Sequence, residues 1–213
     1  MKINFEYNKE KDVWCLLNKG RSSNNSQNST RQYLLLTDKY GETPTEENAG
    51  AFVDTYISEN KIDIQKTITD IQNDWDIISN EYQKRAETIF NTSLPQEITA
   101  YLTINSRCPY SIEDEFFYIY LQSAQARKTI MHELWHFYTW YGLGPSEEAR
   151  IGAQKYNDIK ESLTVLLNVE CKDLLPEGVL DSGYPQHNEL REKILDYWGK
   201  EKNIKNLWNY ISK

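Results

Sequence analysis

A chain of 213 residues, of which 39% are hydrophobic and 26% charged, can bury one hydrophobic core, so a single domain over residues 1–213 is expected. Its net charge of −8, with no block of Lys or Arg, argues against a nucleic-acid partner. No apolar run approaches the ~20 residues of a membrane helix, and the N-terminus is already acidic at Glu6, so we expect neither a membrane span nor a secretory signal.

The three cysteines, Cys15, Cys108 and Cys171, are odd in number, widely spaced and without a CxxC pair. This pattern predicts neither a disulfide framework nor a thiolate metal site. Buried free thiols are typical of a reducing compartment, so a cytoplasmic protein is expected.

The N-terminal part, over about residues 1–44, is predicted to be rich in strands. Lys2–Tyr7 alternates polar and apolar residues, as a half-buried strand does. Two short apolar runs, at residues 13–17 and 33–36, predict further strands, and the Gly/Ser/Asn-rich residues 19–31 predict the loop between them.

The remainder, over about residues 45–213, is predicted to be mainly helical. Thr45, followed by two acidic residues, predicts a capped helix start before residues 49–57. Residues 62–90 carry apolar side chains at spacings of three, four and seven, which predicts one long amphipathic helix.

Strands return after Pro95, at residues 97–105 and in the aromatic run 116–121. A helix over residues 125–140 should end near Gly142 and Pro145, because Gly and then Pro are common beyond a helix end. The later segments are predicted to be a helix at about 147–169 with Glu147 and Glu148 capping its first turn, a loop at 176–185, and closing helices at 188–198 and 204–211. Together these elements predict an α+β fold.

Residues 132–136, His-Glu-Leu-Trp-His, match the pattern HExxH. On a helix, positions i and i+4 share a face, so His132 and His136 can reach one ion. Glu133 lies about 100° round the helix, where it can act as a general base without binding the metal. The alternative is a core histidine pair satisfied without metal. The chain has only three His, two of them in this spacing, which favours the metal site.

The stretch Thr-Ile-Met-His-Glu-Leu-Trp-His-Phe-Tyr at residues 129–138 resembles the extended active-site helix of the zincin metallopeptidases. The resemblance implies that His132 and His136 bind Zn²⁺ and that Glu133 polarises the attacking water. The aromatic run 116–121 resembles the edge strand on which zincins lay an extended substrate. The implied fold is a small mixed sheet whose aromatic edge strand packs on the HExxH helix, with further helices.

A catalytic zinc site usually has three protein ligands. Thr139 and Gly142 occupy the positions at which metzincins carry a glycine and a third histidine, so that group is excluded. The gluzincin pattern takes a Glu from the next helix, and we select Glu161 because its segment is otherwise largely apolar. The other candidates are Glu147, Glu148 and Glu170, with Asp158 as the weakest of them.

The neighbourhood of Glu161 carries two further expectations. Lys160 should point about 100° away, which leaves zinc as the cation that meets a buried Glu161. Thermolysin-like gluzincins have an Asp four residues after the ligand Glu, where this chain has Val165. Asp158 or Asn168 are the candidates to orient a zinc-binding histidine in its place.

The third histidine, His187, lies in a polar loop before a helix, where a surface or capping role is common. The functional alternatives are a hydrogen bond to the oxyanion, alone or with Tyr184, or replacement of Glu161 as the ligand.

These features predict a zinc-dependent hydrolase, in particular a metallopeptidase that acts on a peptide or protein substrate with Glu133 as general base. The alternative is a zinc-stabilised binding or regulatory module without turnover, in which a fourth protein ligand completes the site.

Overall fold

The computed structural model describes residues 1–17 and 30–213 and shows an α+β protein. Its contacts form two compact units. Unit 1 comprises Met1–Asp74 and Pro95–Ala126, and unit 2 comprises Trp75–Leu94 and Arg127–Lys213. The expected loop at residues 19–31 lies outside the described residues, except for its last two positions.

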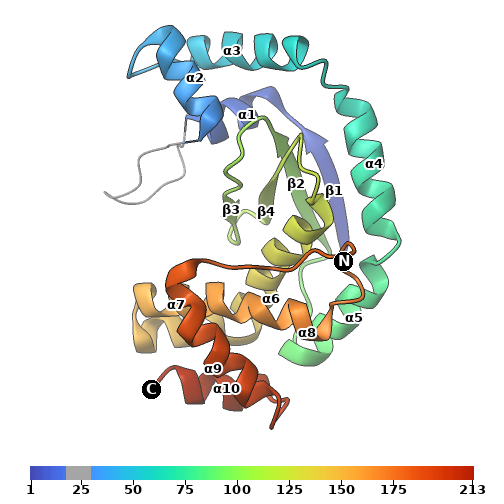
Figure 1. Cartoon of the computed structure of the whole chain (residues 1–213), viewed down its shortest axis with the longest axis vertical. Coiled ribbons are helices and arrows are strands. Elements are labelled where there is room, and N and C mark those ends of the chain that lie inside the picture. The colour runs from blue at the N-terminus through green and yellow to red at the C-terminus, as the bar shows by residue number, and fades with distance from the viewer. Residues whose placement is uncertain (18–29) are drawn as a thin grey trace. The chain divides into compact units, whose positions relative to one another are not determined.

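Unit 1 contains a four-stranded mixed sheet (Figure 1). The strands are β1 (Lys2–Tyr7), β2 (Glu97–Thr103), β3 (Tyr110–Ser111) and β4 (Phe116–Tyr120), in the order β1-β2-β4-β3. β2 is parallel to both β1 and β4, whereas β3 is antiparallel to β4. The strands expected at residues 2–7, 97–105 and 116–121 are therefore confirmed.

The expectation that the aromatic strand lies at an edge of the sheet is wrong. β4 has β2 on one side, and on the other the two residues of β3 pair with Phe116 and Phe117. The amide of Tyr118 also donates to the carbonyl of Pro109. The chain between β2 and β4 thus folds back along β4, and a two-residue strand is too short to leave a pattern in the sequence.

The strands expected at residues 13–17 and 33–36 are helices α1 (Lys9–Leu16) and α2 (Arg31–Tyr40). Both helices have side-chain caps, Asn8 accepting from the amide of Lys11 and Thr30 from the amide of Tyr33. A short apolar run does not distinguish a strand from a helix, and here the preceding cap decides.

Helix α3 (Glu46–Glu59) begins after Thr45, which forms a capping box, so the expected start is confirmed. The single helix expected at residues 62–90 is instead two helices, α4 (Ile64–Asp76) and α5 (Ser79–Phe90). The turn between them leaves Ile77 exposed and lets the rings of Trp75 and Tyr82 pack edge to face.

A buried carboxyl group in unit 1 leads to a pH prediction. Asp12 on α1 accepts hydrogen bonds from the hydroxyl of Thr103 and the amide of Ile104, yet burial raises its pKa to about 6 from the ordinary 3.8. The stabilisation that protonated Asp12 gives should be complete below about pH 4 and be lost as the pH rises through 6.

The expected result is that the unfolding free energy of the wild type, relative to Asp12→Asn, falls by about 2–3 kcal/mol between pH 4 and pH 7. Urea unfolding of both proteins across this range measures the difference, and the non-titrating variant cancels the contribution of other groups. A difference that stays constant or rises with pH would contradict the raised pKa.

Unit 2 is helical, and its longest helix is α6 (Ala126–Ile151). The expected end near Gly142 is wrong, because the helix continues through Gly142 and Pro145. A Cβ on Gly142 would lie 3.0 Å from the carbonyl oxygen of Phe90, so this glycine permits close packing on α5. Pro145 lacks the N–H that would bind the carbonyl of Tyr141, and the hydroxyl of Thr92 donates to that carbonyl instead.

The helix predicted to begin near Glu147 begins instead at Ala153, after Gly152, whose φ of +85° breaks the helix. Glu147 and Glu148 therefore lie near the end of α6, and their predicted capping role is wrong. The carboxylate of Glu147 accepts from the guanidinium of Arg150 and the indole of Trp208.

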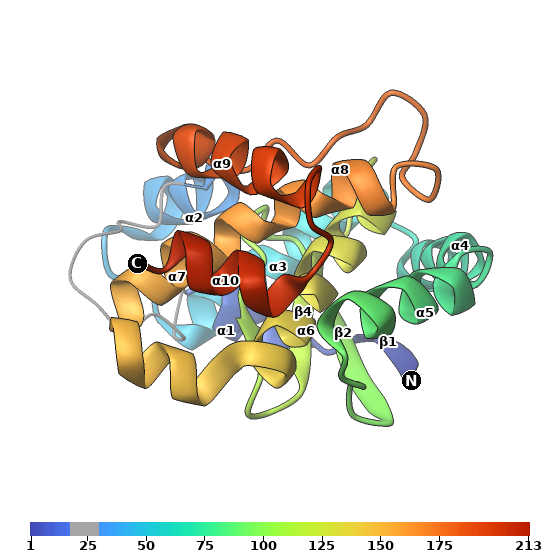
Figure 2. The ribbon, with the colours of Figure 1, turned by 90° about the horizontal axis from the view of Figure 1, so that it is seen from below.

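The elements of unit 2 that follow α6 are shorter helices. They are α7 (Ala153–Leu163), the 3₁₀ helix η1 (Thr164–Leu166), α8 (Leu167–Glu170), the 3₁₀ helix η2 (Pro185–His187), α9 (Asn188–Trp198) and α10 (Ile204–Ile211). The loop at 176–185 and both closing helices are confirmed. Figure 2 shows α9 beside α10, and α9 also packs on α7. Within the described residues, no helix has the length and apolarity to cross a membrane.

Candidate metal centre

Helix α6 presents His132, Glu133 and His136, and hydrogen bonds with neighbouring helices fix its position. The hydroxyl of Tyr82 donates to the carbonyl of Met131 over 2.7 Å. The indole of Trp135 donates to the carbonyl of Leu163 over 3.1 Å. Met131 and Trp135 are fully buried, so the helical turn between the two histidines is anchored in the core by these two residues.

Glu161 reaches this turn because the bond from Trp135 ties the last residue of α7 to α6. The carbonyl of Glu161 lies 2.8 Å from the hydroxyl of Thr164, at the start of η1. The turn that carries Glu161 is therefore fixed from both sides, although Glu161 lies 25 positions after His136 in the chain.

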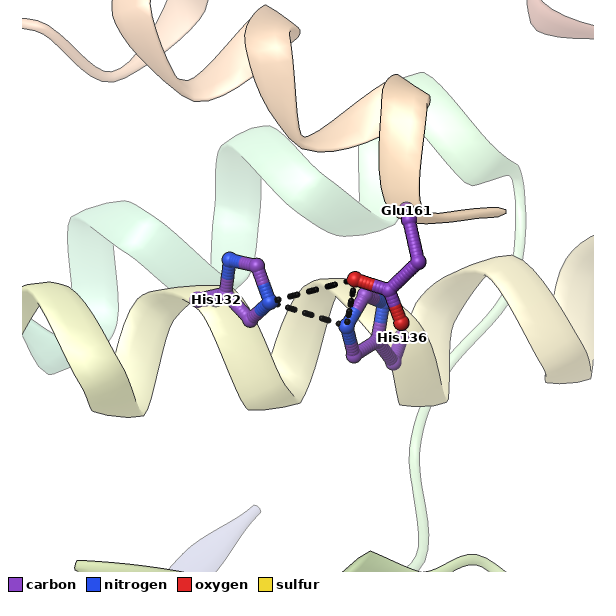
Figure 3. Close-up of side chains that lie close together, drawn as sticks. All are labelled: His132, His136 and Glu161. Carbon is purple, nitrogen blue, oxygen red and sulfur yellow. Dashed lines mark hydrogen bonds and ion pairs between the residues drawn. The ribbon is translucent and has the colours of Figure 1, made fainter. Parts of the chain in front are cut away.

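Three side-chain atoms converge in this cluster (Figure 3). The Nε2 atoms of His132 and His136 lie 3.0 Å apart, and Oε2 of Glu161 lies 3.7 Å from the first and 3.4 Å from the second. The point equidistant from the corners of such a triangle is about 2.0 Å from each, which is the length of a Zn–N or Zn–O bond. His132, His136 and Glu161 could therefore hold a metal ion.

A carboxylate that the sequence analysis missed fixes the ring of His132. Oδ2 of the buried Asp181 lies 2.6 Å from Nδ1 of His132. A neutral imidazole that donates from Nδ1 keeps its lone pair on Nε2, the atom that faces His136 and Glu161. Asp181 therefore selects the tautomer that a metal ligand needs.

Asp181 is held in turn by side chains from three elements. The hydroxyl of Thr164 lies 2.7 Å from Oδ1, and the guanidinium of the buried Arg191 donates to the carbonyl oxygen and to Oδ1. The side-chain amide of Asn168 exchanges two hydrogen bonds of 2.8 Å with the main chain of Asp181.

The structure thus gives the orienting role to Asp181 and not to Asp158 or Asn168. Asp181 lies in a loop 49 residues after His132, and no spacing rule connects the two positions. The sequence indicated only one member of this arrangement, Asn168, whose side chain holds the main chain of Asp181.

Burial and neighbouring charges shift the pKa values of the cluster. Burial lowers the pKa of His132, but hydrogen bonds to Asp181 and Glu161 outweigh it and raise the pKa to about 10. Burial and the charge of His132 lower the pKa of His136 to about 4. Burial opposes ionisation of Glu161, but hydrogen bonds from both histidines prevail and lower its pKa. The proton on His132 is the charge that a bound metal ion replaces.

Glu133 lies beside this cluster in a buried position. Among the residues that the structure describes, its Oε2 has no hydrogen-bond partner. Burial raises the pKa of Glu133 to about 7, and the charges of His132 and Glu161 both act on it. An unpaired buried carboxylate oxygen is costly, so a hydrogen-bond donor from a water molecule or a substrate group would stabilise it.

Lys160 contradicts the sequence expectation. It was expected to point away from Glu161, but its Nζ lies 3.3 Å from Oε1 of Glu161, and the side chain is buried. The long, flexible side chain curls back along its own helix, and the direction of its Cβ does not determine where the ammonium lies. Glu161 therefore has a cationic partner besides any metal ion.

The two predicted oxyanion donors lie outside the group of three. Nε2 of His187 lies 3.3 Å from Oδ1 of Asp158, and His187 is buried in η2. Tyr184 is half exposed, and its ring meets the imidazole of His187 edge to face at 5.8 Å. Within the described part of the chain, Glu161 and not His187 joins the two histidines of the motif.

Comparisons with known proteins found no relative. The chain matches no family model, no curated protein and no solved structure. Its function is therefore inferred from the chemistry of the site.

Proposed function

We propose that this protein is a zinc-dependent hydrolase, a metallopeptidase of the zincin type that cleaves a peptide or protein amide bond. The observation that carries the proposal is the convergence of His132, His136 and Glu161 beside the buried Glu133. Two imidazoles and one carboxylate are a donor set of catalytic zinc sites, in which three protein ligands leave a position for water or substrate.

The chain's own residues have separate tasks in this reaction. Zinc held at this site would polarise the scissile carbonyl and lower the pKa of the attacking water. Glu133 accepts the proton of that water and delivers it to the leaving amine. Asp181 accepts from Nδ1 of His132 and so leaves Nε2 to the metal ion that would displace its proton, and His187 and Tyr184 are proposed to donate hydrogen bonds to the oxyanion.

A purely structural zinc site is the competing function. Structural sites are closed by four protein ligands. Among the residues that the structure describes, the group has three members, and the neighbouring Asp181 is engaged by His132, Thr164 and Arg191. A group of three ligands beside an unpaired carboxylate favours turnover.

Metal-dependent cleavage of a peptide library tests the proposed function. The purified protein should carry about one zinc per chain by elemental mass spectrometry, since the described site takes one ion. It should cleave peptides, lose activity after treatment with a chelator, and recover it when zinc is restored. Protein that retains zinc and cleaves no peptide would support the binding module instead.

The hydrogen bond between Asp181 and His132 leads to a second prediction. Asp181→Ala should weaken zinc binding by about 10–100-fold, because the ring of His132 loses the acceptor that fixes its tautomer. Asp181→Asn should weaken it less, since the amide oxygen still accepts. Competition with a chromophoric chelator measures the affinity.

Asp158→Ala is the matched control, because Asp158 contacts His187 outside the group of three. It should leave zinc affinity unchanged. If Asp158→Ala weakens binding as much as Asp181→Ala does, the orienting role of Asp181 is wrong.

A further inference from the structure

Lys160 places a positive charge directly against a proposed metal ligand. Its Nζ lies 3.3 Å from Oε1 of Glu161 and donates to Oδ1 of Asn157 over 2.9 Å. Asn157 lies one turn earlier on α7, so the lysine side chain is anchored along the helix. The side chain is 7% exposed, so the charge of the ammonium group is buried.

The two oxygens of Glu161 therefore face different partners. Oε2 faces the Nε2 atoms of His132 and His136, and Oε1 faces Lys160. A carboxylate can bind a metal ion through one oxygen or through both. An ion pair at Oε1 competes with the two-oxygen mode.

We propose that Lys160 is a positioning residue that reserves Oε1, so that Glu161 offers only Oε2 to the metal ion. The inference rests on the metal site of the proposed function. Binding through one oxygen limits the protein to three donor atoms and leaves room at the metal for water and substrate. The charge of Lys160 also lowers the pKa of Glu133 and of His136, so it acts on the other residues of the site as well.

This role and a merely structural one predict opposite changes in metal affinity. If Lys160 only neutralises Glu161 in the fold, its loss should disorder the carboxylate and weaken metal binding. If it reserves Oε1, its loss removes a repelling cation and frees a second donor oxygen, so binding should become tighter.

Substitution of Lys160 with methionine tests the proposal, because methionine keeps the length and apolar character of the stem. Lys160→Met should bind zinc at least about tenfold more tightly than wild type in chelator competition. After loading with Co²⁺, its visible absorption should be weaker than that of wild type, because the absorption falls as the coordination number rises. Lys160→Arg, which retains the charge, should restore wild-type behaviour.

Lys193→Met is the matched control, because Lys193 is exposed and pairs with Glu189 on α9. It should change neither affinity nor spectrum. Unchanged or weakened zinc binding in a folded Lys160→Met variant would overturn the proposal.

A crystal structure of the zinc-loaded wild type provides a test that needs no variant. It should show one oxygen of Glu161 at the metal, and two would overturn the role of Lys160. A wild-type chain that takes up neither zinc nor cobalt would overturn the proposed function together with this inference, whereas normal uptake with an unaffected Lys160→Met overturns this inference alone.

Discussion

Replacing Glu133 with glutamine is expected to reduce peptide turnover by several orders of magnitude while zinc content and folding stay nearly unchanged. Glutamine keeps the shape of the side chain but cannot accept a proton. The carboxylate is buried beside the metal group, and its Oε2 has no hydrogen-bond partner among the described residues, so the substitution breaks no hydrogen bond at that oxygen. Single-turnover kinetics with a cleaved peptide, alongside the zinc content of each preparation, measures the effect.

The Glu133→Gln variant distinguishes a catalytic zinc site from a structural zinc module. A catalytic site loses chemistry and keeps its metal, whereas a structural zinc module shows no turnover to lose. Activity of Glu133→Gln within about tenfold of wild type would eliminate Glu133 as the general base.

Replacing His136 with alanine is expected to abolish tight zinc binding, with a loss of affinity of more than about a hundredfold. His136 is 1% exposed, and its Nε2 lies 3.0 Å from that of His132, so its loss removes one of the three donor atoms of the group. Elemental analysis after dialysis against a competing chelator gives the retained zinc. His132→Ala should behave in the same way.

His187→Ala is the matched control for this prediction, since it removes the third histidine of the chain from a buried site outside the group. It should keep the zinc and lose mainly turnover. Glu161→Ala should lose zinc affinity by at least about tenfold. Zinc lost from His187→Ala but kept in Glu161→Ala would place the protein in a three-histidine class.

Sequence patterns with a local cause predicted their elements well. The HExxH spacing placed both histidines on one helical face, and the cap at Thr45 predicted the start of α3. The closing helices α9 and α10 begin and end at the residues that the sequence predicted. Each of these features depends on residues within one or two turns of each other.

Patterns whose meaning depends on distant partners gave wrong predictions. The apolar run at residues 13–17 became a helix, and the Gly–Pro signal at residues 142–145 did not end α6. Gly142 instead permits the approach of Phe90, a contact between residues more than 50 positions apart in the chain. A one-dimensional pattern cannot distinguish a glycine that ends a helix from one that allows close packing.

The candidate site likewise has features that the sequence predicted and features that only the tertiary structure decided. The sequence alone determined that His132 and His136 share one face of a helix with Glu133 beside them, because the 3.6-residue period of the helix fixes their relation. Only the tertiary structure decided that Glu161 completes the group, that Asp181 orients His132, and that Lys160 turns toward Glu161. The physical reason is that these contacts join separate segments or depend on the bend of a flexible side chain, and packing alone sets both.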